Sequence, residues 1–395
     1  MCIQTHKTME IITWHISIKS IFENNRNIFN IKHKGQIRPN TIKNVEKVLG
    51  CWSTMWFASY KCDWCNKVKH INFTCKSRFC NSCSQPQSDI WMNKIISRRP
   101  QRLLYNHIIF TMPQELRRFF KDHRKALNIL PYTAAHAIMH FLRDQKITPW
   151  ILAAVHTFWA KLNWNAHTHL IVTHWAIHDN WNFKNNIFLP YKAIGTSRTT
   201  YLVKNLRDRT KKNLTWEKCK NELRFINTFY NYHSKISGEK TNRNVHFPEK
   251  PNSFYKIVWY IGRYVRRPII AQSRILAYDW ENITYNYFDK KDKIIKEISC
   301  SATEFIGLLV QHIPQKNFHM LYYYGIFANR TKQKYLTIIH NFFNQPKYTI
   351  HIPKSFAERI FLFTGKNPLQ CNCWWIFHKF KLSIPWYPNI LYDTS

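Results

Sequence analysis

Two histidines, His167 and His169, stand one residue apart at the start of an apolar, β-branched run. The run predicts a buried strand that begins near Ala166. Because side chains alternate between the two faces of a strand, both imidazoles should point the same way. With a third ligand, for which His156 is a candidate, they can hold a divalent ion and leave positions open for a phosphate oxygen and water. The pair alone is a weak signal, because the chain has 20 histidines.

Two tyrosines form the second group that could carry chemistry. Residues 258–270 are rich in arginine and apolar residues and predict a helix. Tyr260 and Tyr264 would then lie one turn apart on the same face. The alternative is an amphipathic helix whose tyrosines pack in a core or an interface. The neighbouring arginines favour a surface that faces phosphate: Arg263, Arg266 and Arg267. Arg274 is a further candidate for contacts to phosphate.

A tyrosine hydroxyl is a weak nucleophile at neutral pH, since its pKa is about 10. It therefore needs an electrophile that a metal polarises and that is held in line. Mg²⁺ or Mn²⁺ would serve, and Mn²⁺ should bind imidazoles more readily, because Mg²⁺ prefers oxygen ligands. The histidines and tyrosines together predict metal-assisted attack on a phosphodiester.

Cysteines mark a separate region. Six of the 11 cysteines fall between residues 51 and 83. The pairs Cys62–Cys65 and Cys80–Cys83 are 14 residues apart, close to the spacing of a tetrahedral zinc site. We expect these four to form one closed structural zinc site. A disulfide cluster is the alternative, and we find no secretory signal that would direct the chain to an oxidising compartment.

The remaining cysteines leave choices open. Cys51 and Cys75 could complete a second zinc site with His70, or either could replace one member of the quartet. Cys371 and Cys373 form a pair without a partner pair, so we expect free thiols there.

The composition indicates a polyanionic partner. Lys and Arg number 59 against 22 Asp and Glu, a formal net charge of +37. Aromatic residues make up 16%, which suits base stacking as well as core building. No apolar stretch approaches the roughly 18 to 20 residues of a membrane-spanning helix. We therefore expect a DNA-binding protein with no membrane partner, in the cytoplasm and associated with the nucleoid.

The order of predicted elements indicates the fold class. A helix should begin at Asn40 or Thr41, and a strand at residues 107–112 precedes a helical hairpin at 114–145 and strands at 150–158 and 166–173. This order favours an α/β (α+β) sandwich with an antiparallel sheet over a doubly wound parallel one. Residues 197–250 are basic and predict helices over DNA, a mobile insert or a solvated surface. His136 and His140 are expected on a helix face, because Ala137 replaces the glutamate of zinc proteases.

Several strings, in this order, resemble the HUH transposases of rolling-circle insertion sequences. They lie at residues 44–51, 75–83, 107–117, 156–169, 260–268, 273–275, 304–305, 312–314 and 324–330. Together they span roughly residues 35 to 335. The resemblance implies an HUH-type antiparallel sheet sandwiched by helices and preceded by a small zinc-binding domain. The expected boundaries are a helical segment at 1–50, the zinc-binding domain at 51–98, the catalytic domain at 99–285 and an accessory region at 286–395.

The resemblance also implies a reaction. Tyr260 or Tyr264 would attack DNA at single-stranded or hairpin element ends and form a 5′-phosphotyrosine with a free 3′-hydroxyl. A plasmid replication initiator or relaxase would share these residues, and an inactive zinc-dependent DNA-binding descendant stays open. Trp159 and Trp175 replace glycines of the family pattern, and only 8 glycines occur in the chain. Glycine in such positions often allows close backbone approach or a positive φ, so either tryptophan could obstruct the DNA path or strain a turn.

Overall fold

The fold is described from a computed structural model of the 395-residue chain. It describes residues 16–51, 57–75, 77, 80–97, 104–213, 254–265, 268–342 and 367–383, with isolated positions at 224, 226–228, 231, 245–246, 355, 357–358, 361 and 365.

An antiparallel sheet lies at the centre of the molecule. Its strand order is β11 (Leu321–Gly325), β4 (Ile147–Phe158), β5 (Trp164–His178), β3 (Tyr105–Phe110) and β7 (Val245–His246), and β6 (Phe183–Asn185) extends β5. Every strand pairing that involves this sheet is antiparallel in the described chain. The expected α+β class with an antiparallel sheet is confirmed. β5 runs five residues beyond the expected end, because Trp175 and Ile177 continue the buried pattern.

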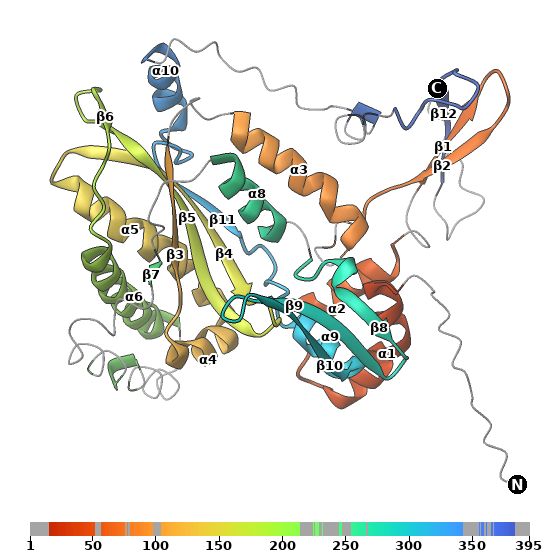
Figure 1. Cartoon of the computed structure of the whole chain (residues 1–395), viewed down its shortest axis with the longest axis horizontal. Helices are drawn as coiled ribbons and strands as arrows, with labels where there is room; N and C mark the ends of the chain where they lie inside the picture. The colour runs from red at the N-terminus through yellow and green to blue at the C-terminus, as the bar shows by residue number, and fades with distance from the viewer. Residues whose placement is uncertain are drawn as a thin grey trace, which may run out of the picture.

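Helices cover both faces of this sheet (Figure 1). One face packs against α5 (Ile129–Arg143) and α6 (Tyr191–Asn213), through strand residues such as Leu170 and Val172. The other face packs against α3 (Asn81–Ser97) and α8 (Phe254–Val265), through residues such as Ile171 and Trp175. The alternation of side chains along β5 thus sends its odd-numbered residues toward α8 in this stretch.

The expected helical hairpin after β3 is divided into three pieces. α4 (Gln114–Asp122) is followed by a short 3-10 helix (Arg124–Asn128) and then by α5. Within α5, His136 and His140 both lie against the ring of Tyr201 from α6. They are helix-face residues that pack on a neighbouring helix, as the sequence predicts.

A second module joins the two halves of the sequence. It contains α1 (Ile18–Lys32), α2 (Pro39–Leu49), α9 (Ala302–Val310) and the sheet of β8 (Ile275–Tyr278), β9 (Asn282–Asp289) and β10 (Ile294–Ser301). One apolar core includes Ile21 and Phe22 of α1 with Phe305 and Leu309 of α9. Capping boxes begin both helices, at Ser17 of α1 and Ser301 of α9.

The third unit is a small three-stranded sheet. β1 (Phe57–Cys62) lies between β2 (Val68–Asn72) and β12 (Phe377–Ser383). Figure 1 shows it as an arm that stands apart from the central sheet. Another helix, α10 (Lys332–Phe342), follows β11.

Strands from the predicted accessory region take part in two of the sheets. β11 and β12 come from the region assigned to an accessory domain, yet β11 is part of the central sheet and β12 is part of the small one. Residues 91–97 form the C-terminal part of the helix α3. Within the described ranges, no helix is long and apolar enough to cross a membrane.

α3 and α8 pack closely where Gly262 lies. The hydroxyl of Ser88 in α3 donates to the Gly262 carbonyl at 2.7 Å. A Cβ added to Gly262 would lie 2.4 Å from Sδ of Met92 and 3.3 Å from the Trp91 ring. Glycine therefore allows this close approach, which fixes the position of α8 over the sheet.

Gly262→Ala should destabilise the protein because the buried side chain of Met92 must move. Overpacking typically costs about 1–3 kcal/mol, and the gain in helix propensity offsets up to about 1 kcal/mol of it. We expect a net loss of about 1 kcal/mol in the free energy of unfolding, measured in urea.

Gly307→Ala in α9 is the matched control, since its Cβ would meet only Phe29 at an ordinary 3.7 Å. That variant should be neutral or more stable, because alanine favours the helix. Equal stability changes in the two variants would show that the α3–α8 contact does not require glycine.

Candidate metal and tyrosine centre

Three histidines come together on the face of the central sheet that α8 covers. His156 of β4 lies directly opposite His167 of β5, and His169 is opposite Ala154 in the same pairing. One ring nitrogen from each histidine lies within 4.8 Å of the others. All three side chains are buried, with exposed fractions of 2%, 9% and 1%. The arrangement offers three nitrogen ligands to one metal ion.

Hydrogen bonds orient two of these rings. Nδ1 of His167 donates to the Asn165 carbonyl at 2.8 Å, which leaves Nε2 as the lone-pair nitrogen. Nδ1 of His169 lies 2.8 Å from Nε2 of His107 in β3. Nε2 of His169 is buried and has no hydrogen-bond partner among the described residues. A buried ring nitrogen without a hydrogen-bond partner is suited to bind a metal ion.

His107 is a residue of the site that sequence reasoning missed. It sits two residues into β3, a strand that adjoins β5, and its ring stacks on His169 with centroids 5.1 Å apart. Strand alternation could have found it, because His107 shares a face with the buried Tyr105. A ligand histidine is commonly held by such a second hydrogen-bonding group.

Burial keeps these imidazoles uncharged. Desolvation lowers the pKa of His107 and of His167 to about 4 in each case. It also lowers the pKa of His156 and of His169 well below the ordinary value of 6.5. Neutral imidazole is the form that binds metals, so the site is ready for an ion at neutral pH.

Tyr260 lies against the histidines. Its ring centroid is 5.5 Å from that of His169 and 5.7 Å from that of His107. Tyr264 follows one turn later in α8, where the structure describes its backbone. The side chain of Arg263 and all of Arg266 and Arg267, expected to face phosphate, lie outside the described residues.

Positive charge approaches the histidines from the turn between β9 and β10. The ammonium group of Lys290 lies near enough to contribute to the lowered pKa values of His107, His167 and His169. Arg117 of α4 acts on His167 in the same way. Both residues were missed in the sequence, because the turn and α4 are distant in the chain from the histidine motif.

Arg274, for which a phosphate contact stays a prediction, donates hydrogen bonds to two backbone carbonyls. Its Nε donates to the Asn286 carbonyl and one terminal nitrogen donates to the Ala160 carbonyl, both at 2.8 Å. These bonds tie the β8–β9 region to the turn between β4 and β5. The structure therefore gives Arg274 a part in holding that turn.

The two tryptophans that replace family glycines differ from each other. Trp175 lies within β5, is 1% exposed and stacks on Phe183, so the expectation that it obstructs DNA or strains a turn is wrong. Trp159 begins the turn between β4 and β5 and is 45% exposed. Its ring is stacked near His167, with centroids 6.0 Å apart. Neither has a positive φ, so neither strains its backbone in that way.

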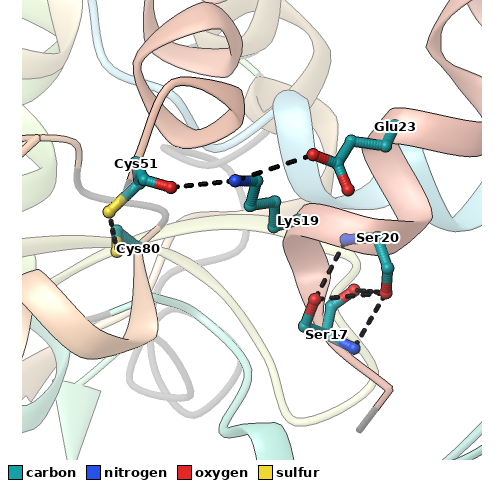
Figure 2. A network of polar contacts seen from close by, with 6 residues as sticks. All are labelled: Ser17, Lys19, Ser20, Glu23, Cys51 and Cys80. Carbon is teal, nitrogen blue, oxygen red and sulfur yellow. Dashed lines mark hydrogen bonds and ion pairs between the residues drawn. The ribbon is translucent and has the colours of Figure 1, made fainter. Parts of the chain in front are cut away.

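A cluster of four buried thiols anchors the N-terminal helices: Cys51, Cys75, Cys80 and Cys83. Sγ of Cys51 lies 3.6 Å from Sγ of Cys80 and of Cys83. Figure 2 shows how α1 reaches the cluster: Lys19 donates to the Cys51 carbonyl at 2.8 Å and pairs with Glu23. The cluster thus ties α1, α2 and the start of α3 together.

The expected quartet of Cys62, Cys65, Cys80 and Cys83 is wrong. The structure separates its two pairs and gives Cys80 and Cys83 to the cluster with Cys51 and Cys75. The spacing of the cysteines was misleading because a segment distant in the sequence can supply half of the ligands of a metal site. His70, the other suggested ligand, bonds instead to the hydroxyl of Ser59 at 2.9 Å.

The lowered pKa values of the buried histidines predict a pH dependence of stability. In the folded protein His107 and His167 stay neutral down to about pH 4, whereas in the unfolded chain they take up protons below about 6.5. The unfolded state then binds more protons, so the free energy of unfolding falls as the pH falls from 6.5 to 4. A shift of this size corresponds to up to about 3 kcal/mol for each histidine.

His107→Gln removes one of these groups. Urea unfolding at pH 7 and pH 5 should show a smaller loss of stability in the variant than in the wild-type protein. Protonation of zinc ligands would lower the stability of both proteins equally. It therefore cancels when the stability loss of the variant is subtracted from that of the wild-type protein. An identical loss in both would contradict the uncharged, buried state of His107.

Comparisons with known proteins find similarity to transposases. Residues 151–334 match a family described as "Putative transposase", and residues 21–112 match a "Transposase zinc-binding domain". The chain is 26% identical over 365 residues to the "Transposase for insertion sequence element IS801" of Pseudomonas savastanoi pv. phaseolicola, covering 90% of this chain and 86% of that protein. It is 22% identical over 339 residues to "Putative transposase y4qJ" of Sinorhizobium fredii, covering 78% and 80%.

No solved structure is significantly similar to the chain. The zinc-binding match covers the four clustered thiols of Cys51, Cys75, Cys80 and Cys83, and the other match covers the histidines and tyrosines. The chain therefore belongs to the insertion-sequence transposases, enzymes that cleave and join DNA, and carries the zinc-binding domain of that family.

Proposed function

We propose that this transposase nicks and joins single DNA strands through a 5′-phosphotyrosine, with a divalent metal held by His156, His167 and His169. One observation carries the proposal: the ring of Tyr260 packs on His169 within a group of buried, uncharged histidines. A nucleophile beside a metal site is the arrangement that phosphoryl transfer needs.

Tyr260 is the first nucleophile in this proposal, because its ring contacts the histidines. Its oxygen attacks the scissile phosphorus, the bond from phosphorus to the 3′ oxygen breaks, and the phenol proton ends on the released 3′-hydroxyl. Tyr264, one helical turn later, would accept a second strand. Two nucleophiles on one helix allow cleavage and joining without a separate nuclease.

The histidine nitrogens fit a divalent metal with open positions. No carboxylate joins this group in the described chain, and three neutral nitrogens suit Mn²⁺ better than Mg²⁺. When bound, the metal would polarise the scissile phosphate and hold it in line for attack. His107 acts as a positioning residue, since it fixes the ring of His169.

Lys290 and Arg117 are candidates for contacts to the DNA backbone. Both side chains lie near the histidines, and neither belongs to the group that could bind the metal. The formal net charge of +37 supports binding along an extended phosphate path. We propose single-stranded or hairpin element ends as the substrate, as the family resemblance implies.

Covalent capture tests the proposed reaction. With Mn²⁺, single-stranded oligonucleotides tiled across the flanks of the encoding element and labelled at the 3′ end should form an adduct that survives denaturing gels. Tyr260→Phe should abolish it, since only the hydroxyl is lost, and Tyr264→Phe should reduce it less. His169→Ala should abolish the adduct while DNA binding persists.

Tyr255→Phe is the matched control, because Tyr255 lies on the same helix but is 50% exposed and contacts Trp259. It should leave the yield unchanged. An adduct of undiminished yield in the Tyr260→Phe, Tyr264→Phe double variant would overturn the mechanism.

The salt dependence of binding tests the phosphate contacts. Affinity for single-stranded DNA should fall linearly on a logarithmic salt scale, with a slope of roughly −0.7 for each phosphate contact. Lys290→Met should reduce the slope by about 0.7. Lys184→Met is the control, since Lys184 pairs with Ala176 at the other end of β5, roughly 23 Å from His169 by strand rise.

Fluorescence anisotropy at several salt concentrations provides the slopes. A slope that is equal in the wild-type protein and in Lys290→Met would remove Lys290 from the DNA path. A flat dependence in the wild-type protein would contradict an electrostatic groove altogether.

One observation favours a second candidate, an inactive DNA-binding descendant. The exposed ring of Trp159 lies beside His167, where a strand would approach the histidines. If the folded, zinc-loaded protein forms no adduct because the Trp159 ring blocks the DNA strand, Trp159→Gly should restore adduct formation. No adduct in that variant, with DNA binding retained, would favour the descendant.

A further inference from the structure

Four cysteines far apart in the sequence meet in the three-stranded arm: Cys62, Cys65, Cys371 and Cys373. Sγ of Cys62 lies 3.4 Å from Sγ of Cys373, and Sγ of Cys65 lies 3.5 Å and 3.6 Å from those of Cys371 and Cys373. A disulfide would bring two sulfurs to about 2.05 Å. Four sulfurs around one tetrahedral zinc lie about 3.8 Å apart, given a zinc–sulfur distance of about 2.3 Å. The spacing fits a shared ion and not two disulfides.

Two tight turns hold these thiols. After β1, Asn66 donates its N–H to the Cys62 carbonyl at 2.9 Å and adopts a positive φ of 57°. Before β12, Cys371 donates to the Trp375 carbonyl at 2.8 Å, and Trp374 adopts a φ of 72°. Each turn aims two sulfurs inward from the end of a strand, as the paired knuckles of a zinc ribbon do.

The strands place the two turns side by side. β1 and β12 are antiparallel, and Cys62 pairs in register with Phe377. Lys69 of β2 donates to the Pro368 carbonyl at 2.6 Å, and Trp64 stacks in parallel on Trp375 at 5.6 Å. These contacts join residues 57–72 to residues 367–383 across about three hundred positions of chain.

Apolar packing alone is weak in this arm. Its buried apolar cluster comprises Cys62, Cys371 and Phe377 among the described residues. A core of this size supplies little stabilisation, and units so small usually depend on a disulfide or a metal.

We propose that these four cysteines form a second structural Zn²⁺ site, which the C-terminal segment completes. Cys371 and Cys373, expected from the sequence to be free thiols outside any site, would then be ligands. The zinc-binding family match ends at residue 112 and includes only half of this site. The second ion therefore holds the C-terminal segment on the N-terminal domain, and a chain cut before residue 367 lacks the site.

Metal analysis of the full-length protein tests the proposal. The Cys371→Ser, Cys373→Ser double variant should contain one zinc equivalent fewer than the wild-type protein. Cys300→Ser is the control, because Cys300 lies outside both thiol clusters. It should keep the full zinc content. Counting the difference makes the result independent of any zinc that the histidine site takes up.

Hydrogen exchange supplies a second readout. In the double variant, β1 and β12 should lose protection while β4 and β5 keep theirs, which shows that the rest of the protein is folded. Equal zinc content in the double variant and the wild type would overturn the proposal. Iron in place of zinc, seen by metal analysis and visible absorption, would overturn the identity of the ion.

Discussion

The burial of uncharged imidazoles on one face of the central sheet is the constraint on which the rest of the structure depends. His156, His167 and His169 are buried, and burial keeps each pKa far below its ordinary value. Placing polar rings in a core is costly unless each nitrogen finds a partner. His107 and the Asn165 carbonyl satisfy two of these nitrogens, and a metal would satisfy the nitrogens that face the centre. The strands must therefore keep their register, since a slip of one residue would turn the rings to the other face.

The position of α8 follows from the packing around it. α3 begins at the thiol cluster of Cys51, Cys75, Cys80 and Cys83 and then crosses α8 at Gly262. The same cluster is part of the apolar core of α1, α9 and the β8–β10 sheet. Through this series of contacts, the zinc-binding domain and the module that carries Lys290 both help to position α8. They thereby support the sheet face where Tyr260 contacts the histidines. A domain named for binding zinc is thus also a support for the centre proposed to cleave DNA.

Much of the fold could be predicted from the sequence, because the relevant signals are local. Apolar runs indicated β3, β4 and β5, and their order indicated an antiparallel sheet between helices. Alternation also put His167 and His169 on one face. What could not be predicted depends on contacts between distant segments. β11 and β12 come from the C-terminal part, and the thiols of Cys62 and Cys65 meet partners near residue 371. His107, Lys290 and Arg117 reach the site from elements that are distant in the chain from the histidine pair. Trp175 fills a core where a family glycine suggested a turn.

The central claim is that the three buried histidines and Tyr260 form one metal-and-nucleophile centre. Crystals of the protein grown with Mn²⁺, measured for anomalous scattering at the manganese absorption edge, test it most directly. We predict a manganese peak between the inward-facing ring nitrogens of His156, His167 and His169, with the Tyr260 hydroxyl directed toward the ion's open positions. A fully folded protein in which manganese is absent from these nitrogens, or in which the Tyr260 hydroxyl points away from them, would contradict the account.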